Sequence, residues 1–216
     1  MRSHTPSPAT ILDAVQARYA TLAEGSDSLS CGDALAGAAP LTGEVVVDLG
    51  CGRGRDALRA AAQVGSAGQA IGVDASGAML QQARSNVPSG LLNVRFVQSE
   101  LAALFLDDRI ADVVISSCAI NHAPDKAAVY REIHRILKPG GRFVVADVVC
   151  DSELPDTVRN DPDAWAACYG GAIPMRDYVA AIEGAGFARI EVLRRTAPYS
   201  KAAVLVRSIT VRGYRP

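Results

Sequence analysis

Short runs of apolar, β-branched residues alternate along this chain with segments in which apolar residues recur every three or four positions. Such runs are typical of strands, and the helical spacing is typical of amphipathic helices. Strands are predicted over residues 45–49, 70–74, 94–98, 112–117, 142–149, 190–194 and 203–212. Helices are predicted over residues 10–23, 56–64, 77–86, 125–137 and 175–185. This alternation predicts an α/β fold, with a mostly parallel sheet and helices on both of its faces.

Three segments interrupt the alternation. Residues 25–40 are rich in Gly, Ser and Ala and predict a loop, which contains Cys31. Residues 138–141, Lys-Pro-Gly-Gly, predict a helix stop and a turn, because neither Pro nor Gly favours a helix interior. Residues 151–174 form a longer excursion that carries the only tryptophan of the chain and Cys168.

Polar residues and cysteines gather at the predicted carboxyl ends of the strands. They are Asp48, Asp74, Ser99, Glu100, Ser117, Cys118, Asp147 and Cys150. Because the carboxyl ends of parallel strands lie along one edge of a sheet, these residues are expected to meet there. A ligand is therefore predicted to bind outside that edge.

The first strand runs directly into a glycine-rich turn and then into an Ala-rich helix. Residues 48–54 read Asp-Leu-Gly-Cys-Gly-Arg-Gly, and Arg55 stands where a dinucleotide-binding turn has its third glycine. Glycines let a ligand approach the backbone closely, and a helix N-terminus offers free N–H groups. The acid Asp48 suits a cationic or zwitterionic nucleoside better than a pyrophosphate. The turn therefore predicts a nucleoside site.

Asp74 ends the second predicted strand, 20 residues after Gly54. An acid at this distance reaches ribose hydroxyls, and a carboxylate can accept two hydrogen bonds from a vicinal diol. The other interpretation of Asp74 is a cap on the following helix. Glu100 stands where an acceptor could bind an adenine amino group. Met79 could pack on the adenine, although a methionine in such a place is more often part of the core.

The overall composition limits the partners and the compartment. A formal net charge of −1 offers no basic field, so no nucleic-acid partner is expected. No segment reaches the roughly 20 apolar residues that span a membrane, so no membrane partner is expected. Residues 1–10 contain no apolar signal-peptide core. The expectation is a cytoplasmic protein with a small-molecule substrate, as a monomer or weak dimer.

The five cysteines include no C-x-x-C pair, so a structural zinc site is not expected. In a reducing compartment an odd number of cysteines favours free thiols. The plain interpretation of each one is a small buried hydrophobic residue.

Residues 46–54, Asp74 and residues 137–142 together resemble a class I S-adenosylmethionine-dependent methyltransferase, from about residue 45 to the C-terminus. The resemblance implies a Rossmann-like sheet of seven strands, mostly parallel, with the antiparallel last strand inside the sheet. It implies that Gly50 and Gly52 contact the methionine part of the cofactor, Asp74 the ribose and Glu100 the adenine. The full predicted cofactor site is Asp48, Gly50, Gly52, Asp74, Ala75, Met79, Ser99, Glu100 and Ser117. Residues 1–43 are expected to form an N-terminal helix and a substrate-side loop, and residues 44–216 the methyltransferase domain, within a single domain.

Two further segments are similar to the arsenite methyltransferase family. They are residues 28–32 and 159–172, supported by residues 117–121 and 124–126. In that family both matching cysteines take part in binding and methylating trivalent arsenic, which implies these roles for Cys31 and Cys168. The chemistry agrees with this, because As(III) is a soft centre that selects thiolate ligands.

Methyl transfer to a thiolate-bound arsenic needs no general base, because the arsenic lone pair carries no proton and attacks the sulfonium methyl group directly. S-adenosyl-L-homocysteine is the expected product. No catalytic histidine is therefore expected. His134 is interpreted as a surface or packing residue, and His122 as a residue that could line the site.

The chain departs from the family in one respect, since no cysteine follows Cys168. Typical members carry one cysteine at the extreme N-terminus and often one in a C-terminal region that completes the arsenic site. The third ligand is then expected from a thiol co-substrate such as glutathione, or from Cys150. Two alternatives stay open: a methyltransferase for O-, N- or C-methylation of a small organic metabolite, and a non-enzymatic module that binds a metalloid or senses S-adenosylmethionine.

Overall fold

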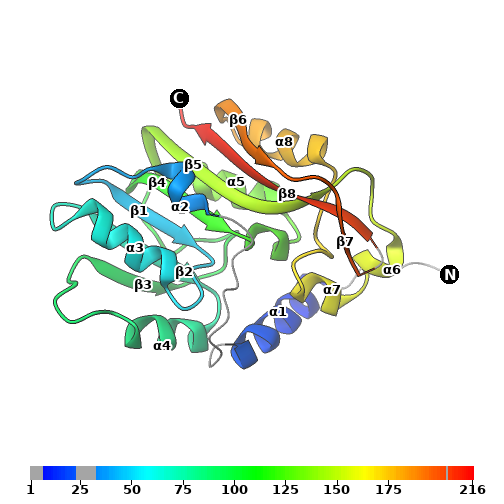
Figure 1. The fold of residues 1–216 in the computed structure, drawn as a ribbon, viewed down its shortest axis with the longest axis horizontal. Helices are drawn as coiled ribbons and strands as arrows, with labels where there is room; N and C mark the ends of the chain where they lie inside the picture. Colours follow the sequence, from blue (N-terminus) through cyan, green and yellow to red (C-terminus); the bar gives the residue numbers. More distant parts are fainter. Residues whose placement is uncertain (1–6, 23–32, 203) are drawn as a thin grey trace.

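The computed structural model describes residues 7–22, 33–202 and 204–216. The sheet in this part of the chain is ordered β3-β2-β1-β4-β5-β8-β6, with the short β7 paired to β8 (Figure 1). The strands are β1 (Val45–Leu49), β2 (Gln69–Asp74), β3 (Val94–Gln98), β4 (Ala111–Ser117), β5 (Leu137–Cys150), β6 (Ala188–Arg195), β7 (Tyr199–Lys201) and β8 (Val204–Tyr214). All seven predicted strands are present, and β7 is an additional one.

Parallel pairing extends from β3 to β5, and β8 then lies antiparallel between β5 and β6. The central strand β1 is buried along nearly its whole length, as expected for a parallel strand that is covered on both faces. The predicted Rossmann-like sheet, with its antiparallel last strand inside the sheet, is confirmed.

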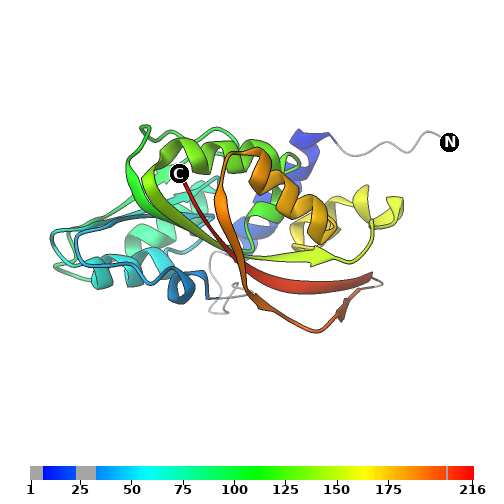
Figure 2. The ribbon, with the colours of Figure 1, turned by 90° about the horizontal axis from the view of Figure 1, so that it is seen from above.

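Helices cover both faces of the sheet, as predicted. The helices α2 (Ala34–Ala38) and α3 (Arg55–Val64) share a buried apolar cluster with one face, and α5 (Lys126–Ile136) and α8 (Met175–Gly184) share a larger cluster with the other. Figure 2 shows these two groups on opposite sides of the strands. The remaining long helix beside the sheet, α4 (Gly77–Ser85), packs against β3. Among the described helices, none combines the length and the apolar character that crossing a bilayer requires.

A separate group of helices lies at the carboxyl edge of the sheet. There α1 (Pro8–Leu22) packs along α7 (Pro162–Ala166), and both contact the short helix η1 (Ile120–His122). The fourth member, α6 (Asp156–Arg159), precedes α7 and contacts it. Figure 1 shows α1 and α7 side by side, beyond the ends of the arrows of β1 and β2. The edge predicted to bind a ligand is therefore partly enclosed by helices.

The prediction of a loop over residues 25–40 is wrong for its last part, which contains α2. The Asp33 side chain accepts a hydrogen bond from the Ala36 backbone at 3.1 Å and caps this helix. Leu35 and the alanines of α2 then pack onto the sheet. Residues 23–32, which include Cys31, lie outside the described residues.

The prediction of a helix stop and a turn over residues 138–141 is confirmed for the stop. In place of a separate turn, the structure has an irregularity inside β5, where the pairing with β4 passes from Ala111 with Leu137 to Val113 with Arg142. The helix α5 ends at Ile136, and β5 begins at Leu137 without a connecting turn. The Gly140 backbone donates to the Arg215 carbonyl, and the Arg215 backbone donates to Gly141, both at 2.9 Å. Pairing with the distant last residues therefore draws this segment into the sheet.

Arg142, in β5, binds residues at the end of α2 and just before β1. Its guanidinium binds both carboxylate oxygens of Glu44, at 2.8 and 2.9 Å. It also donates to the carbonyls of Ala38 and Ala39, at 2.9 and 3.1 Å. This bidentate ion pair is geometrically specific, and it fixes the chain at the amino end of β1, the strand that leads into the glycine-rich turn.

Candidate functional site

The glycine-rich turn after β1 requires glycine where the chain passes closest to its neighbours. Gly50 has φ of +70°, and a Cβ atom there would lie 2.2 Å from the Ala119 Cβ. Gly52 has φ of +52°, which is also the left-handed region that favours glycine. The backbone N–H groups of Gly50 and Cys51 both donate to the Val73 carbonyl, at 2.8 and 2.9 Å. The turn is therefore held against the ends of β2 and β4.

Asp48 lies beneath this turn and is almost completely buried. Its carboxyl group accepts a hydrogen bond from the Ala57 backbone in α3, whose N-cap residue, Gly54, offers no side chain. Burial raises the pKa of Asp48 well above its usual range, and the nearby charges of Asp56 and Asp74 raise it further. The structure thus places Asp48 as a support of the turn and of the start of α3.

Asp74 joins the end of β2 to the glycine-rich turn. Its two carboxylate oxygens accept hydrogen bonds from the backbone of Gly52, at 2.9 Å, and of Ser76, at 2.8 Å. The cap of α4 is Ser76, whose hydroxyl accepts from the Met79 backbone at 3.3 Å. The alternative interpretation of Asp74 as a helix cap is therefore wrong. Burial raises the pKa of the Asp74 carboxyl group.

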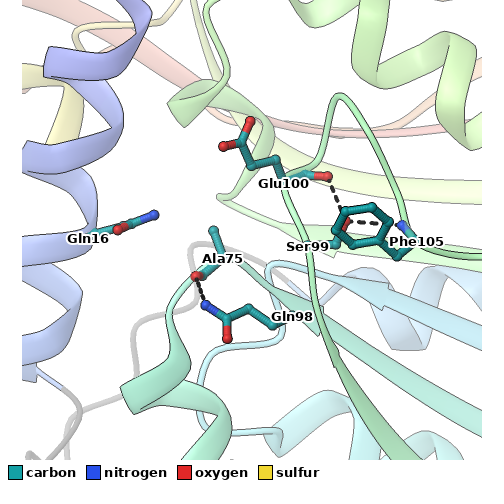
Figure 3. A pocket seen from close by; sticks show the side chains of 6 residues that line it. All are labelled: Gln16, Ala75, Gln98, Ser99, Glu100 and Phe105. Atoms are coloured by element: carbon teal, nitrogen blue, oxygen red, sulfur yellow. Dashed lines mark hydrogen bonds between the residues drawn. The ribbon is translucent and has the colours of Figure 1, made fainter.

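A pocket of about 360 Å³ opens at the carboxyl ends of β2 and β3 (Figure 3). It is lined by Gln16, Ala75, Gln98, Ser99, Glu100 and Phe105. Three of the predicted cofactor residues, Ala75, Ser99 and Glu100, are thus brought together in one place. The other three, Gln16 from α1, Gln98 and Phe105, were not predicted as site residues. Nothing in the local sequence connects α1 with this strand edge.

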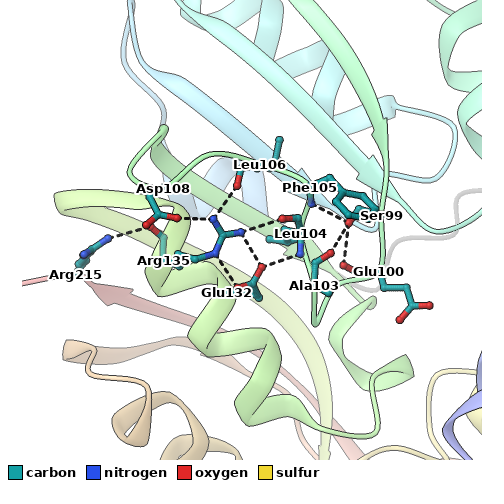
Figure 4. Close-up of polar contacts among 10 residues, drawn as sticks. All are labelled: Ser99, Glu100, Ala103, Leu104, Phe105, Leu106, Asp108, Glu132, Arg135 and Arg215. Atoms are coloured by element: carbon teal, nitrogen blue, oxygen red, sulfur yellow. Dashed lines mark hydrogen bonds and ion pairs between the residues drawn. The ribbon is translucent and has the colours of Figure 1, made fainter.

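One wall of the pocket is the connection between β3 and β4, which Arg135 of α5 holds in place (Figure 4). The Arg135 guanidinium donates to the carbonyls of Leu104, at 3.0 Å, and of Leu106, at 2.8 Å. It also pairs with Asp108 at 2.7 Å and with Glu132 at 2.8 Å. The Ser99 hydroxyl stabilises the same β3–β4 connection. It donates to the Ala103 carbonyl at 2.8 Å and accepts from the Phe105 backbone N–H at 3.1 Å.

Two other predicted cofactor residues differ in their accessibility. Met79 has no exposed surface, and its sulfur lies 4.0 Å from a Cβ built at Gly52. It therefore packs under the glycine-rich turn. Ser117, at the end of β4, has a buried hydroxyl that finds no hydrogen-bond partner among the described residues. A buried polar atom without a partner is costly, so this hydroxyl is available to a ligand.

Cys168 lies at the same end of the sheet, in a cluster of three side chains from distant parts of the chain. Its sulfur is 3.3 Å from Nε2 of His122 and 3.4 Å from the hydroxyl of Tyr19. The Tyr19 hydroxyl is itself 3.1 Å from the same His122 nitrogen. Cys168 is only 7% exposed, and burial raises the pKa of its thiol. The sequence predicted neither contact.

Side-chain hydrogen bonds to backbone carbonyl groups hold the loop that carries Cys168 in place. Trp165 donates through its indole nitrogen to the Arg159 carbonyl at 2.9 Å. Asn121 donates to the Val148 carbonyl at 2.6 Å and, more weakly, to the Cys168 carbonyl at 3.4 Å. Cys168 itself has φ of +66°, which is unusual for a residue with a side chain. The position of the thiol is therefore determined by the packing of α7 on η1.

A buried polar network lies beneath this cluster. Asp147 accepts from the Tyr178 hydroxyl at 3.0 Å, and Tyr178 accepts from Tyr130 at 3.0 Å. Burial raises the pKa of Asp147 to about 6 and lowers that of the nearby Lys126 ammonium group to about 8. The Lys126 ammonium group lies 5.6 Å from the centre of the Trp165 ring, close enough for a cation–π contact. The sequence placed Asp147 at this edge but gave no sign of its partners.

The remaining cysteines occupy different surroundings. Cys51 and Cys150 are free and buried, as is Cys168, whereas Cys118 is not a free thiol, contrary to expectation. Cys150 lies in an apolar cluster, and its sulfur contacts the Ala172 carbonyl at 3.6 Å. Burial raises the pKa of the Cys150 thiol to about 11. Cys31 lies outside the described residues. No group of three or more His, Cys, Asp or Glu side chains in the described part of the chain could hold a metal ion.

The chain is similar in sequence and in fold to known methyltransferases. Residues 41–199 match the model of a methyltransferase domain family. The arsenite methyltransferase of Halobacterium salinarum is 42% identical over 175 residues, which cover 80% of this chain and 45% of that protein. The arsenite methyltransferase of Aquipseudomonas alcaligenes is 40% identical over 156 residues, which cover 68% of this chain and 44% of that protein. The chain spans less than half the length of these curated relatives.

A solved structure extends the similarity to the fold. The crystal structure of an arsenic(III) S-adenosylmethionine methyltransferase from Chlamydomonas reinhardtii matches with a TM-score of 0.76 and 34% sequence identity. The match covers 92% of this chain and 72% of that one.

Proposed function

Because this chain belongs to the arsenite methyltransferase family, we propose that it methylates trivalent arsenic held by cysteine thiolates, with S-adenosylmethionine as the methyl donor. The observation that carries the proposal is the position of Cys168. Its buried thiol meets His122 and Tyr19 at the edge of the sheet where the glycine-rich turn ends. A soft thiolate at this edge suits a soft acceptor.

The residues around the glycine-rich turn fit S-adenosylmethionine. The turn leaves no room for a side chain at Gly50, and the Ser117 hydroxyl lacks a partner among the described residues. When bound, S-adenosylmethionine supplies an electrophilic methyl group. In this proposal Gly50 and Gly52 contact its methionine part and Asp74 the ribose hydroxyls. Ala75, Ser99 and Glu100 surround the adenine in the pocket that they line.

The acceptor site is proposed to use Cys31 and Cys168, with a third thiol completing the ligands of arsenic. Glutathione is one source of that thiol, and Cys150 is the other. Cys150 ends β5 at the same edge, and the charge of Lys126 acts on Cys150 and on His122. The protein then has to hold the two reactants in contact and exclude water, since the arsenic lone pair needs no base for methyl transfer.

Arsenic speciation tests the proposed function. The reduced protein is incubated with arsenite, glutathione and S-adenosylmethionine, and the arsenic species are separated and quantified. Methylated arsenic that depends on both protein and S-adenosylmethionine is the expected result. If arsenite stays unmethylated while the protein binds S-adenosylmethionine normally, arsenic is not the acceptor, and an organic metabolite takes its place as the substrate to be sought.

Substitution Asp74→Asn is expected to weaken S-adenosylmethionine binding by about 1–3 kcal/mol, because the charged acceptor of two hydroxyl hydrogen bonds is lost. Titration calorimetry measures this effect as a dissociation constant. Asp107→Asn, at an exposed acid before β4, is the matched control and should leave the constant unchanged. An affinity in Asp74→Asn equal to that of the unmodified protein would remove Asp74 from the ribose site.

Substitution Cys150→Ser distinguishes the two sources of the third thiol. If Cys150 is a ligand, arsenite methylation falls at low glutathione and recovers as glutathione is raised, because the added thiol replaces the missing one. The measurement is the initial rate of methylation over a range of glutathione concentrations. Equal rates for the variant and the unmodified protein at every concentration would assign the third position to glutathione alone.

A further inference from the structure

The two ring nitrogens of His122 have partners that fix where its proton lies. Nδ1 is 2.9 Å from the backbone carbonyl oxygen of Trp165, an atom that can only accept a hydrogen bond. Nδ1 therefore carries the hydrogen. Burial lowers the pKa of His122 to about 4, so the ring is neutral near pH 7 and Nε2 carries a free lone pair.

That lone pair faces the thiol of Cys168. The sulfur lies 3.3 Å from Nε2, and the Tyr19 hydroxyl lies 3.4 Å from the sulfur. The Tyr19 hydroxyl lies within reach of both atoms, 3.1 Å from Nε2 and 3.4 Å from the sulfur. When this hydroxyl donates to the sulfur, the thiol can donate its hydrogen to Nε2. This pairing provides an acceptor for the proton that leaves and a donor for the thiolate that remains.

We propose that His122 accepts the proton of Cys168 when this thiol captures trivalent arsenic, and that Tyr19 stabilises the sulfur as its proton leaves. The inference rests on the proposed function, because arsenic capture by Cys168 is part of it. It concerns the step that precedes methyl transfer.

The step is balanced without any further reagent. Arsenous acid meets the thiol, a sulfur–arsenic bond forms and one arsenic–oxygen bond breaks. The thiol proton passes to Nε2 of His122 and from there to the departing hydroxide, which leaves as water. His122 returns to its neutral state, and no atom changes its oxidation state.

The surroundings of the ring keep the thiol protonated until arsenic arrives. Besides Tyr19 and Cys168, the charged groups that act on His122 are Lys126 from α5, Asp147 from β5 and Asp74 from the end of β2. Burial lowers the pKa of His122 more than the two acids raise it, and burial raises the pKa of Cys168. A resting thiolate–imidazolium pair is therefore unfavourable, and the proton moves only as the sulfur–arsenic bond forms.

Capture and methyl transfer can be measured separately. The only tryptophan of the chain, Trp165, lies three residues before Cys168, so mixing the reduced protein with arsenite in a stopped-flow fluorimeter follows capture. Methyl transfer is followed by adding S-adenosylmethionine to protein already loaded with arsenite. The variants are His122→Gln, which keeps an acceptor near the sulfur, and His122→Asn, which keeps a donor near the Trp165 carbonyl. Neither side chain can take up the proton.

Loss of the proton acceptor is expected to slow capture by about 100-fold in both variants, the lower end of the usual contribution of a general base. Methyl transfer in the preloaded protein should proceed at the rate of the unmodified protein, because that step needs no base. His134→Gln, at a histidine of α5 that packs on Phe187, is the matched control and should change neither rate.

Two results would overturn the role of His122: capture at the unmodified rate in both variants, or equal losses in capture and methyl transfer, which would indicate a structural role. A failure of the proposed function looks different. In that case the unmodified protein itself gives no fluorescence change with arsenite, or gives no methylated arsenic after loading.

Discussion

Replacement of Cys168 by serine is expected to reduce arsenite methylation by at least about 100-fold, a loss of about 2.7 kcal/mol of transition-state stabilisation. A serine hydroxyl is nearly the same size as the thiol and can keep hydrogen bonds to His122 and Tyr19. It is, however, a hard oxygen donor with a very high pKa, and it does not replace a thiolate as a ligand of a soft centre. The initial rate of formation of methylated arsenic measures the effect.

Binding of S-adenosylmethionine provides the control for this variant. Cys168 lies on the loop between α7 and α8, whereas Asp74 and the adenine pocket belong to the ends of β2 and β3. The dissociation constant of S-adenosylmethionine and the melting temperature of Cys168→Ser should therefore match those of the unmodified protein. Unimpaired methylation of arsenite by this variant would refute the assignment of Cys168 as an arsenic ligand.

Substitution Gly171→Ala is expected to lower the stability of the protein by about 3 kcal/mol, at the upper end of the range for overpacked sites. A Cβ atom at this position would lie 2.0 Å from the backbone oxygen of Asn121 and 2.6 Å from the Trp165 ring. Backbone atoms cannot rotate away as a flexible side chain does, so the loop has to separate from η1. Thermal unfolding should show a fall in melting temperature of roughly 10 °C.

Gly184→Ala is the matched control for this substitution. Gly184 ends α8, and no atom lies within 4 Å of a Cβ built there. Alanine favours a helix over glycine, so this variant should gain up to about 1 kcal/mol. Since Gly171 belongs to the loop of Cys168, its variant should also capture arsenite more slowly. A melting temperature of Gly171→Ala that equals that of Gly184→Ala would contradict the packing of this loop on η1.

The sheet was predictable because its strands carry their signal locally. The run 45–49 is apolar except for Asp48, as a strand covered on both faces requires. The turn that follows needs glycine at position 50, because a Cβ atom there would collide with Ala119. The elements that were missed depend on distant partners. The helix α2 has only five residues, too few for helical spacing to be recognised. The strand character of residues 138–141 depends on pairing with Arg215.

The candidate site also contains residues whose proximity was predictable from the sequence and contacts that were not. Asp74, Ala75, Ser99 and Glu100 end neighbouring strands, so the sheet order alone predicts that they lie together. The contacts of Cys168 with His122 and Tyr19 join residues 46 and 149 positions apart in the chain, and no periodic pattern encodes them. For Asp48 the sequence predicted the position but not its contact, since the carboxyl group supports α3 from below the turn.

The helix α1 contacts both parts of the candidate site, the pocket at the ends of β2 and β3 and the cluster around Cys168. Gln16 lines the pocket at the ends of β2 and β3, and Tyr19, one turn further along the same face, contacts Cys168. Under the proposed function the methyl donor lies beside Gln16 and the acceptor lies beside Tyr19, so we expect each ligand to alter the affinity of the other through α1. The two effects must be equal in free energy, because linkage between two sites is reciprocal. We therefore expect the methyl donor and its acceptor to bind cooperatively, with the shared helix α1 as the connection between them.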